Sequence, residues 1–364
     1  MKIAQVSPLY ESVPPKLYGG TERVVSYLTE ELVKQGHDVT LFASGDSKTR
    51  ANLISTVPEA LRLGDSLDPN VYNYIQLQRV VEMAHEFDII HFHTDYLHFP
   101  ITALGGWPSV TTLHGRLDIR GLDILYRHFT DIPVVSISYS QRRPLPHAGW
   151  VGNVYHGLPE DLYKMGSGNG GYAAFLGRIS PEKRVDRAIE IARHAGLQLR
   201  VAAKIDPADR EYYEREIKHL MEQPHVEFIG EIGEDQKGEF LGNATVTLFP
   251  IDWPEPFGMV MIESMACGTP VVAYDHGSVS EVLSDGETGY IVNSMEEAVD
   301  AVKNIHKLSR MHCHETFLKR FSVKRMVEDY LEIYASTVEQ FRKIRLPANA
   351  ELRSDELSSS ILSA

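Results

Sequence analysis

The sequence predicts an α/β protein of two Rossmann-like domains whose parallel sheets face a central cleft. The chain has 364 residues, more than one typical domain and suited to two of roughly 150 to 200 residues each. Short apolar runs alternate with longer helical patterns almost throughout, which is typical of buried parallel sheets covered by helices on both faces. The alternation starts again after a glycine-rich segment at residues 166–171.

The first half carries five apolar runs that we expect to form strands, at residues 2–6, 38–42, 88–92, 109–113 and 133–137. Helical patterns over residues 21–35 and 71–86 separate them. We therefore assign residues 1–155 to a first, acceptor-side Rossmann-like domain. The change of domain is expected between residues 154 and 171.

The second half repeats the pattern. Strands are expected at residues 172–176, 197–203, 226–229, 246–250 and 270–274, with helices at 182–194, 209–222 and 258–267. Residues 172–321 thus form a second Rossmann-like domain. A long amphipathic helix over residues 322–343 is expected to return to the first domain, and residues 344–364 to form a poorly ordered polar tail. Open parallel sheets bind ligands at the carboxyl ends of their strands, so two facing sheets would share one binding cleft.

The composition excludes several classes of function. The formal net charge is −14, which argues against non-specific binding to nucleic acid or anionic lipid. Only two cysteines occur, too few for a disulfide framework or a cysteine-rich zinc site. The chain opens on a strand pattern rather than a signal peptide, and no run approaches the roughly 18 apolar residues of a transmembrane helix. We expect a cytoplasmic protein, and the sequence gives no indication of membrane association.

The strongest local signal is the segment 255–263, which reads EPFGMVMIE. Its proline and glycine prevent an early helix start, so the amides of residues 257–260 would form a helix N-terminus, a natural phosphate site. Glu255 precedes this helix and Glu263 lies within it, and carboxylates accept paired hydrogen bonds from the vicinal hydroxyls of a sugar or ribose. Alternatively, Glu255 is a turn residue and Glu263 a solvated one, although an unpaired carboxylate among apolar neighbours is costly.

A second signal is basic and follows the strand expected at residues 172–176. Arg178 and Lys183 stand five residues apart at the carboxyl end of that strand. An arginine fork and a lysine point charge placed there can together hold a diphosphate. The alternative is a solvated basic loop.

A third signal is Gly19-Gly20, before a helix for which Thr21 is the expected N-cap. Glycines at such a point let the backbone approach a phosphate closely, although Gly-Gly before a helix is often only a turn. No G-x-G-x-x-G follows any expected strand, which counts against a dehydrogenase.

Histidines mark the expected cleft edge of the first domain. His114 follows the strand at residues 109–113, either as part of a reaction centre or as a satisfied polar residue. His91 and His93 point the same way along another strand, with Asp95 nearby, which raises the idea of a metal site. Because no clear further ligand accompanies them, we expect no metal.

With these motifs in view, the sequence resembles the family-4 retaining glycosyltransferases, whose GT-B architecture pairs two Rossmann-like domains. The resemblance covers residues 1–343 and rests on an ordered set of segments: GGTE at 19–22, DIIH at 88–91, TLHG at 112–115, VSIS at 135–138, FLGRISPEK at 175–183, VEFIG at 226–230 and the Glu255/Glu263 pair. Two positions depart from the family pattern. AAKID at residues 202–206 replaces a frequent glycine-rich turn, and Arg184 stands where glycine commonly follows Lys183.

The resemblance implies roles for these residues. Arg178 and Lys183 resemble the diphosphate clamp, helped by the loop that carries Gly19 and Gly20. Glu255 resembles the contact to the hydroxyls of the donor sugar.

The remaining roles are implied in the same way. Glu263 resembles the ribose-binding carboxylate, Ile232 the backbone contact to the base, and His114 the residue beside the donor sugar in the reaction centre. Backbone amides that donate to the sugar and phosphates are implied at Phe257, Gly258, Met259 and Val260.

Together, the residues and the resemblance predict a retaining glycosyltransferase that needs no metal and no cofactor. It would move a hexose, expected to be glucose, from a nucleotide sugar, expected to be UDP-glucose. The expected acceptor is a hydroxyl of a growing polysaccharide, a lipid-linked sugar or a small molecule, and no nucleic acid partner is expected. The alternatives are a nucleotide-sugar epimerase with the same cleft and a non-catalytic protein that binds nucleotide sugars.

Overall fold

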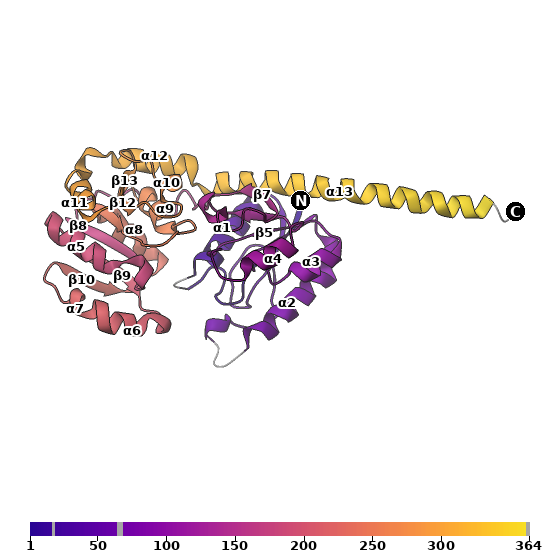
Figure 1. Ribbon diagram of the computed structural model, residues 1–364, viewed down its shortest axis with the longest axis horizontal. Coiled ribbons are helices and arrows are strands. Elements are labelled where there is room, and N and C mark those ends of the chain that lie inside the picture. The colour runs from indigo at the N-terminus through magenta and orange to yellow at the C-terminus, as the bar shows by residue number, and fades with distance from the viewer. Residues whose placement is uncertain (17–18, 64–67, 362–364) are drawn as a thin grey trace.

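Two parallel β-sheets organise the chain, one in each of two lobes (Figure 1). The computed structural model describes residues 1–16, 19–63 and 68–361, with the backbone alone over residues 344–361. Neighbouring strands run parallel in both sheets. The predicted fold class is therefore confirmed.

The first sheet has the strand order β3-β2-β1-β4-β5-β6-β7. Its strands are β1 (Lys2–Val6), β2 (Asp38–Phe42), β3 (Asn52–Ile54), β4 (Ile89–Phe92), β5 (Ser109–Thr112), β6 (Val134–Ser136) and β7 (Trp150–Asn153). Its helices are α1 (Gly20–Lys34), α2 (Pro69–Met83), α3 (Phe99–Gly105) and α4 (Leu122–His128). The order reverses between β1 and β4, and the loops after such strands diverge to leave a crevice at the carboxyl edge of the sheet.

The second sheet has the order β10-β9-β8-β11-β12-β13. Its strands are β8 (Tyr172–Arg178), β9 (Gln198–Lys204), β10 (Val226–Gly230), β11 (Val246–Phe249), β12 (Val271–Tyr274) and β13 (Gly289–Val292). Its helices are α5 (Val185–Ala195), α6 (Arg210–Tyr212), α7 (Lys218–Met221), α8 (Glu234–Asn243), α9 (Met259–Ala266), α10 (Val279–Val282), α11 (Met295–Lys303) and α12 (Arg310–Arg320). Here the order reverses between β8 and β11, which places a second crevice after those strands.

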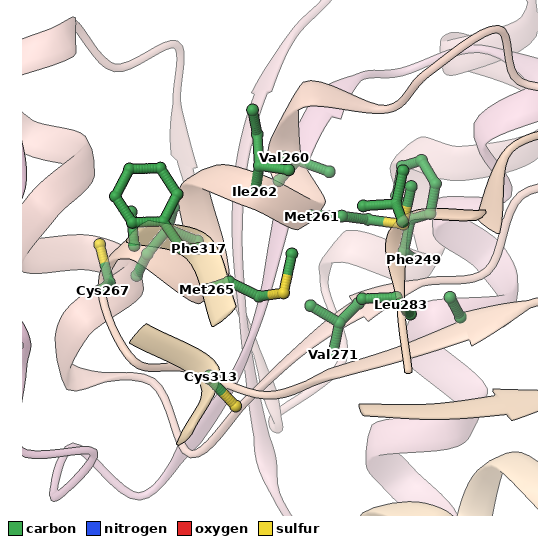
Figure 2. Packing of buried hydrophobic residues seen from close by; sticks show 14 of the residues in the cluster. Phe249, Val260, Met261, Ile262, Met265, Cys267, Val271, Leu283, Cys313 and Phe317 are labelled. Carbon is green, nitrogen blue, oxygen red and sulfur yellow. The ribbon is translucent and has the colours of Figure 1, made fainter. Parts of the chain in front are cut away.

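Helix α9 is embedded in the core of the second lobe. Met261, Ile262 and Met265 are fully buried, and the same cluster includes Cys313 and Phe317 of α12 (Figure 2). Close packing of this kind leaves a helix little freedom to shift. The start of α9 and the carboxylate that it carries are therefore held in fixed positions.

The chain crosses between the lobes twice, and the two crossings pair with each other. The amide of Leu158 donates to the carbonyl of Phe321 over 2.9 Å, and the amide of Val323 donates to the carbonyl of Leu158 over 2.8 Å. These two segments are the only stretches of backbone that link the described parts of the two lobes.

Helix α13 (Val323–Ile361) begins at the second crossing and runs along the first lobe (Figure 1). Met326, Tyr330 and Tyr334 are fully buried in one cluster with Ile3 and Leu28 of that lobe. The final helix of the chain thus completes the core of the first lobe rather than that of the second.

The helix predicted to end at residue 343 is longer in the structure. Helix α13 continues to Ile361 and projects past the first lobe (Figure 1). Alanine, glutamate and leucine, all strong helix formers, make up six of the fourteen residues from 348 to 361. The predicted poor order of the tail, residues 344–364, stays a prediction, and residues 362–364 lie outside the described part of the chain.

Several predicted element boundaries were also wrong. Pro181 opens a 3₁₀ turn rather than α5, which begins only at Val185. Helix α1 begins at Gly20 with Gly19 in the cap position, so Thr21 is not the cap. The predicted helix over residues 209–222 is interrupted by a π-helical turn over residues 213–217. Strands β3, β7 and β13 were not predicted.

Among the described residues, no helix has the combination of length and apolar character that crossing a bilayer requires.

Candidate active site

A cleft with a volume of about 610 Å³ lies between the lobes, where the carboxyl edges of the two sheets face each other. It is lined by residues that follow β1, β4 and β5 in the first lobe and β8, β9 and β11 in the second. Every residue that the sequence predicts for the site lines this one cleft: Gly19, Gly20, His114, Arg178, Lys183, Ile232, Glu255, Phe257, Gly258, Met259, Val260 and Glu263.

Glu255 is held by a cation and by an indole. The carboxylate forms an ion pair with Lys183 and accepts a hydrogen bond from Trp253 Nε1 at 3.0 Å. The Lys183 ammonium also lies 5.1 Å from the centre of the Trp253 ring and 5.7 Å from that of Phe249. A lysine held by one carboxylate and two aromatic faces is well placed to meet an added anion.

Arg178 lies at the end of β8 and pairs with two carboxylates, Glu182 at 2.7 Å and Asp209 at 3.4 Å. The loop that follows bends sharply at Arg184, whose φ of 53° is in the left-handed region. Glycine is the residue best suited to that conformation, which gives a physical reason for the glycine of the family pattern. Here Asp186 and Asp252 bind the Arg184 guanidinium at 2.8 and 2.9 Å.

The start of α9 has the predicted geometry. Gly258 adopts a φ of 78°, and a Cβ atom added there would lie 2.7 Å from Met261 Cε and 3.1 Å from the Phe249 ring. Only glycine therefore fits without strain or a shift of its neighbours. The first amides of a helix have no partner within the helix, so this end presents donors to the cleft.

Glu263 is buried and paired, which rules out the solvated alternative. Its carboxylate accepts from Lys237 Nζ at 2.8 Å, and the Glu263 side chain is only 5% exposed. Burial alone would lower the pKa of Lys237, but the charges of Glu263 and Glu234 outweigh that effect and raise it. Lys237 therefore stays charged and satisfies one side of the carboxylate.

The same cluster joins the two lobes. Glu234 of α8 lies 3.4 Å from Lys237 and 2.5 Å from Arg23 of α1, and it also accepts a hydrogen bond from Tyr163. The Arg23 side chain is 8% exposed. Burial opposes its charge, but Glu234 raises the pKa of Arg23 in spite of this. A buried ion pair between the lobes favours their present arrangement, because moving one partner away would leave the charge of the other uncompensated.

His114 lies at the end of β5, with its Nε2 atom 2.9 Å from Nδ1 of His93. Its ring stacks on that of His156, whose own ring meets Phe257 of the second lobe edge-on at 4.9 Å. Part of the His114 ring faces the cleft, yet the protein packed around it desolvates it and lowers its pKa to about 3. His114 is therefore neutral at any ordinary pH.

The alternation of His91 and His93 in the sequence suggested a metal site, but in the structure their ring nitrogens make hydrogen bonds. His91 bonds to Tyr334 and Thr112, both at 2.7 Å, and His93 bonds to Gln5 at 2.8 Å and to His114. All four of their ring nitrogens are thus used. Within residues 1–16, 19–63 and 68–361, no group of three or more histidine, cysteine or acidic residues is arranged to hold a metal ion.

Gly19 lies close against another part of its own loop, and its predicted approach to a phosphate stays a prediction. A Cβ atom there would lie 2.7 Å from the Cβ of Pro15, so the loop could not pack as it does with a larger residue. Gly20 has open space around it. Ile232 lies beyond β10 in the partly buried shell of the second lobe's core.

Sequence reasoning missed several residues of the cleft. Trp253 lies two positions before Glu255, so the local motif could have included it. Lys237 and Arg23 carry no such signal, because their partners are far away along the chain. Arg116 is a further lining residue, and its guanidinium lies 5.7 Å from the ring of Trp253 across the cleft.

Two family models match the chain, one for each lobe. Residues 18–149 match the model described as Glycosyltransferase Family 4. Residues 166–317 match the model described as Glycosyl transferases group 1.

Curated relatives include a phosphatidyl-myo-inositol mannosyltransferase of Mycobacterium tuberculosis, 26% identical over 328 residues that cover 80% of this chain and 82% of that protein. A 41.2 kDa protein of unassigned activity in the cps region of Klebsiella pneumoniae is 28% identical over 169 residues, which cover 44% of this chain. The chain spans about half the length of several such relatives: 45% of the Klebsiella protein and 46% of an α-maltose-1-phosphate synthase of Mycolicibacterium smegmatis.

Solved structures share the fold. AviGT4, a glycosyltransferase involved in avilamycin A biosynthesis, has a TM-score of 0.70 at 24% identity, with 93% of this chain and 98% of that chain covered. Anabaena HepE, solved with UDP and glucose, has a TM-score of 0.72 at 18% identity, with 92% and 100% covered.

One carboxyl of the cleft has an unusual proton affinity. Glu22 of α1 is buried, and this burial, with a further contribution from the charge of Glu11, raises its pKa from 4.5 to about 7. The folded state thus binds the proton more tightly than the unfolded state. The contribution of Glu22 to stability is complete below pH 4.5 and is lost as the pH rises through 7.

We predict that Glu22→Gln stabilises the protein at pH 8 but hardly at pH 5, because the amide mimics the protonated carboxyl. The gain in unfolding free energy at pH 8 should reach at most about 3 kcal/mol, the equivalent of the raised pKa. Urea unfolding at both pH values measures it, with the exposed Glu59→Gln as control. A difference from the wild type that does not vary with pH would contradict the account.

Proposed function

We propose, from the premise that the chain belongs to the family-4 glycosyltransferases of the GT-B class, that it moves a hexose from a UDP-sugar to a hydroxyl group with retention of anomeric configuration. Glucose is the proposed hexose, and UDP-glucose the proposed donor. The family models and the named relatives show that the chain is a glycosyltransferase. The donor, the acceptor and the stereochemistry are our proposal.

The observation that carries the proposal is the pairing of two buried carboxylates with two lysines beside a helix N-terminus. Glu255 pairs with Lys183, and Glu263 pairs with Lys237. Each carboxylate keeps lone pairs that can accept vicinal hydroxyls, one pair from a hexose and one from a ribose. The amides at the start of α9 lie beside them and suit the phosphates that join the two sugars.

The choice of UDP-glucose draws on one structural relative. HepE is described in complex with UDP-glucose and shares the fold at a TM-score of 0.71. Other relatives are named for mannosyl transfer or for the synthesis of sucrose phosphate, so donors vary among proteins of this kind.

For the acceptor, we propose a growing polysaccharide or a lipid-linked sugar, with a small molecule as a further possibility. The Klebsiella relative is named for its place in a cps region, and the mycobacterial one is named a phosphatidyl-myo-inositol mannosyltransferase. We place the reaction in the cytoplasm.

In the proposed mechanism, the charge that develops on the departing diphosphate is stabilised by Arg178, Lys183 and the amides of α9. These groups are fixed before the reaction, which is the arrangement that lowers a barrier most effectively. The acceptor hydroxyl attacks from the same face that the phosphate leaves, and the departing phosphate takes its proton. With positive charge already supplied by side chains, we propose that the reaction needs no metal.

We predict that the first product formed from UDP-glucose carries an α-linkage. Nucleotide sugars would be screened by thermal shift, and the stabilising donor then incubated with a membrane extract that supplies lipid-linked acceptors. Proton NMR of the first product reads the anomeric configuration. A β-linked product would contradict retention and would point to a base among the first-lobe carboxylates that line the cleft, Glu22 and Asp95.

We also predict that Arg178→Ala and Lys183→Ala each lower kcat by roughly 100- to 1000-fold, the usual cost of losing one preorganised group at a developing charge. The double variant should lose less than the product of the two, because both cations act on one charge. The exposed Arg193→Ala, on α5 of the same lobe, is the matched control and should leave kcat unchanged. Near-normal turnover in both single variants would refute the clamp.

A further inference from the structure

A chain of hydrogen bonds leads from the first strand of the protein to His114. Gln5 of β1 is fully buried, and its Oε1 atom lies 2.8 Å from His93 Nε2. The other nitrogen of His93, Nδ1, lies 2.9 Å from His114 Nε2. Each contact holds a single hydrogen, so the position of one hydrogen determines the next.

The other end of the Gln5 amide is fixed by α13. Gln5 Nε2 donates to the hydroxyl of Tyr334 at 3.1 Å, and that hydroxyl lies 2.7 Å from His91 Nδ1. His91 Nε2 lies 2.7 Å from the hydroxyl of Thr112, which lies 2.9 Å from that of Tyr330. These contacts can all be made together with one hydrogen in each.

The hydrogens can be placed in order from Gln5. Because its Oε1 atom only accepts, the hydrogen of neutral His93 is on Nε2 and its Nδ1 atom is a lone pair. That lone pair must accept from His114, so His114 carries its hydrogen on Nε2. Its own Nδ1 atom is then an acceptor, and this atom is buried without a hydrogen-bond partner in the described part of the chain.

Turning the Gln5 amide over would reverse every hydrogen in the chain. His114 would then carry its hydrogen on Nδ1, as a buried donor without an acceptor. Orphaned N–H groups are rarer in proteins than under-used acceptors, so the arrangement with Nδ1 as acceptor is favoured.

We propose that Gln5, acting through His93, is a positioning residue that keeps His114 in the Nε2–H tautomer, so that Nδ1 accepts a hydrogen bond from a hydroxyl of the bound donor sugar. The role of the sugar rests on the function proposed above, whereas the tautomer does not. His114 then binds the sugar as a neutral acceptor and does not serve as a proton donor.

The surroundings keep this chain of groups neutral. Burial lowers the pKa of His91, His93 and His156 well below the usual histidine value, and the neighbouring histidines lower that of His93 further. Arg325, beside His156, adds positive charge that acts in the same direction. Burial of Tyr330 and Tyr334 raises the pKa of both phenols, so they stay protonated.

The tautomer is tested without any turnover. Long-range proton–nitrogen NMR of the histidine-labelled protein distinguishes ring nitrogens that carry hydrogen from those that do not, and a His114→Gln variant assigns the signals. We expect hydrogen on Nε2 and none on Nδ1 of His114, with the Nδ1 signal shifting when UDP-glucose is added but not with UDP alone. Hydrogen on Nδ1 would overturn the tautomer, and equal responses to UDP and UDP-glucose would overturn the sugar contact.

Variants test the role of Gln5. Gln5→Glu places a carboxylate beside His93 and favours its charged form, which donates from both nitrogens and forces the hydrogen of His114 onto Nδ1. The kcat/KM for donor should fall roughly 10- to 100-fold, the cost of a mismatched buried polar group. Gln5→Met removes both the acceptor for His93 and the donor to Tyr334 without adding a charge, so it should give a mixture of tautomers and a smaller loss in kcat/KM. This variant replaces Gln5→Glu in the test if the glutamate variant does not fold.

Tyr330→Phe is the matched control. It removes one buried hydrogen bond at the far end of the same chain but leaves the Gln5–His93–His114 contacts intact. Its kcat/KM and its His114 spectrum should match the wild type. If Tyr330→Phe and Gln5→Glu lower kcat/KM equally, Gln5 has a merely structural role. A wild-type protein that turns over no nucleotide sugar would instead refute the proposed function, and the NMR measurement would still decide the tautomer.

Discussion

The cleft depends on charge balance between buried carboxylates and the lysines that hold them. Glu255 and Glu263 line the cavity in positions where a lone carboxylate would be unstable. Lys183 and Lys237 make their burial tolerable, and each lysine comes from a different loop or helix than its partner. The arrangement of β8, α8 and α9 is therefore tied to the pairing of these charges.

The same ion pairs, Lys183–Glu255 and Lys237–Glu263, also bear on the chemistry proposed for the site. Lys183 is shared between Glu255 and two aromatic rings. In the proposed function, an incoming diphosphate would attract Lys183 and leave the carboxylate to the sugar hydroxyls. Lys237 belongs to a cluster that includes Arg23 of the first lobe through Glu234. The proposed ribose-binding carboxylate, Glu263, and the contact between lobes thus share one set of charges, which in the proposed function would couple donor binding to the relative position of the lobes.

The sequence predicted the parts of this structure that depend on local pattern. The run EPFGMVMIE contains the signals that set the start of a helix, so the start of α9 and the carboxylates before and within it could be placed without a structure. The alternation of apolar runs and helices likewise predicted both parallel sheets. Short edge strands such as β3 and β7 have only three or four residues and gave too little pattern to detect.

What could not be predicted depends on residues that are distant in sequence. Nothing near Lys237 indicates that it meets Glu263, and Gln5 and Tyr334 are 329 positions apart. Arg184 illustrates a different limit. A left-handed backbone conformation is normally predicted from a glycine, whereas here an arginine adopts it and two aspartates bind its guanidinium. Histidines gave an ambiguous signal because their ring nitrogens serve hydrogen bonds as readily as metals.

The central claim, a donor site built from paired charges rather than a metal, is tested most directly by calorimetric titration of UDP in the presence of EDTA. The account predicts that the wild type binds UDP under these conditions and that Glu263→Gln, which keeps the shape but removes the charge that holds Lys237, binds it more weakly while remaining folded. Loss of UDP binding in EDTA, restored by magnesium or manganese, would contradict the account. So would unchanged affinity in the folded Glu263→Gln variant.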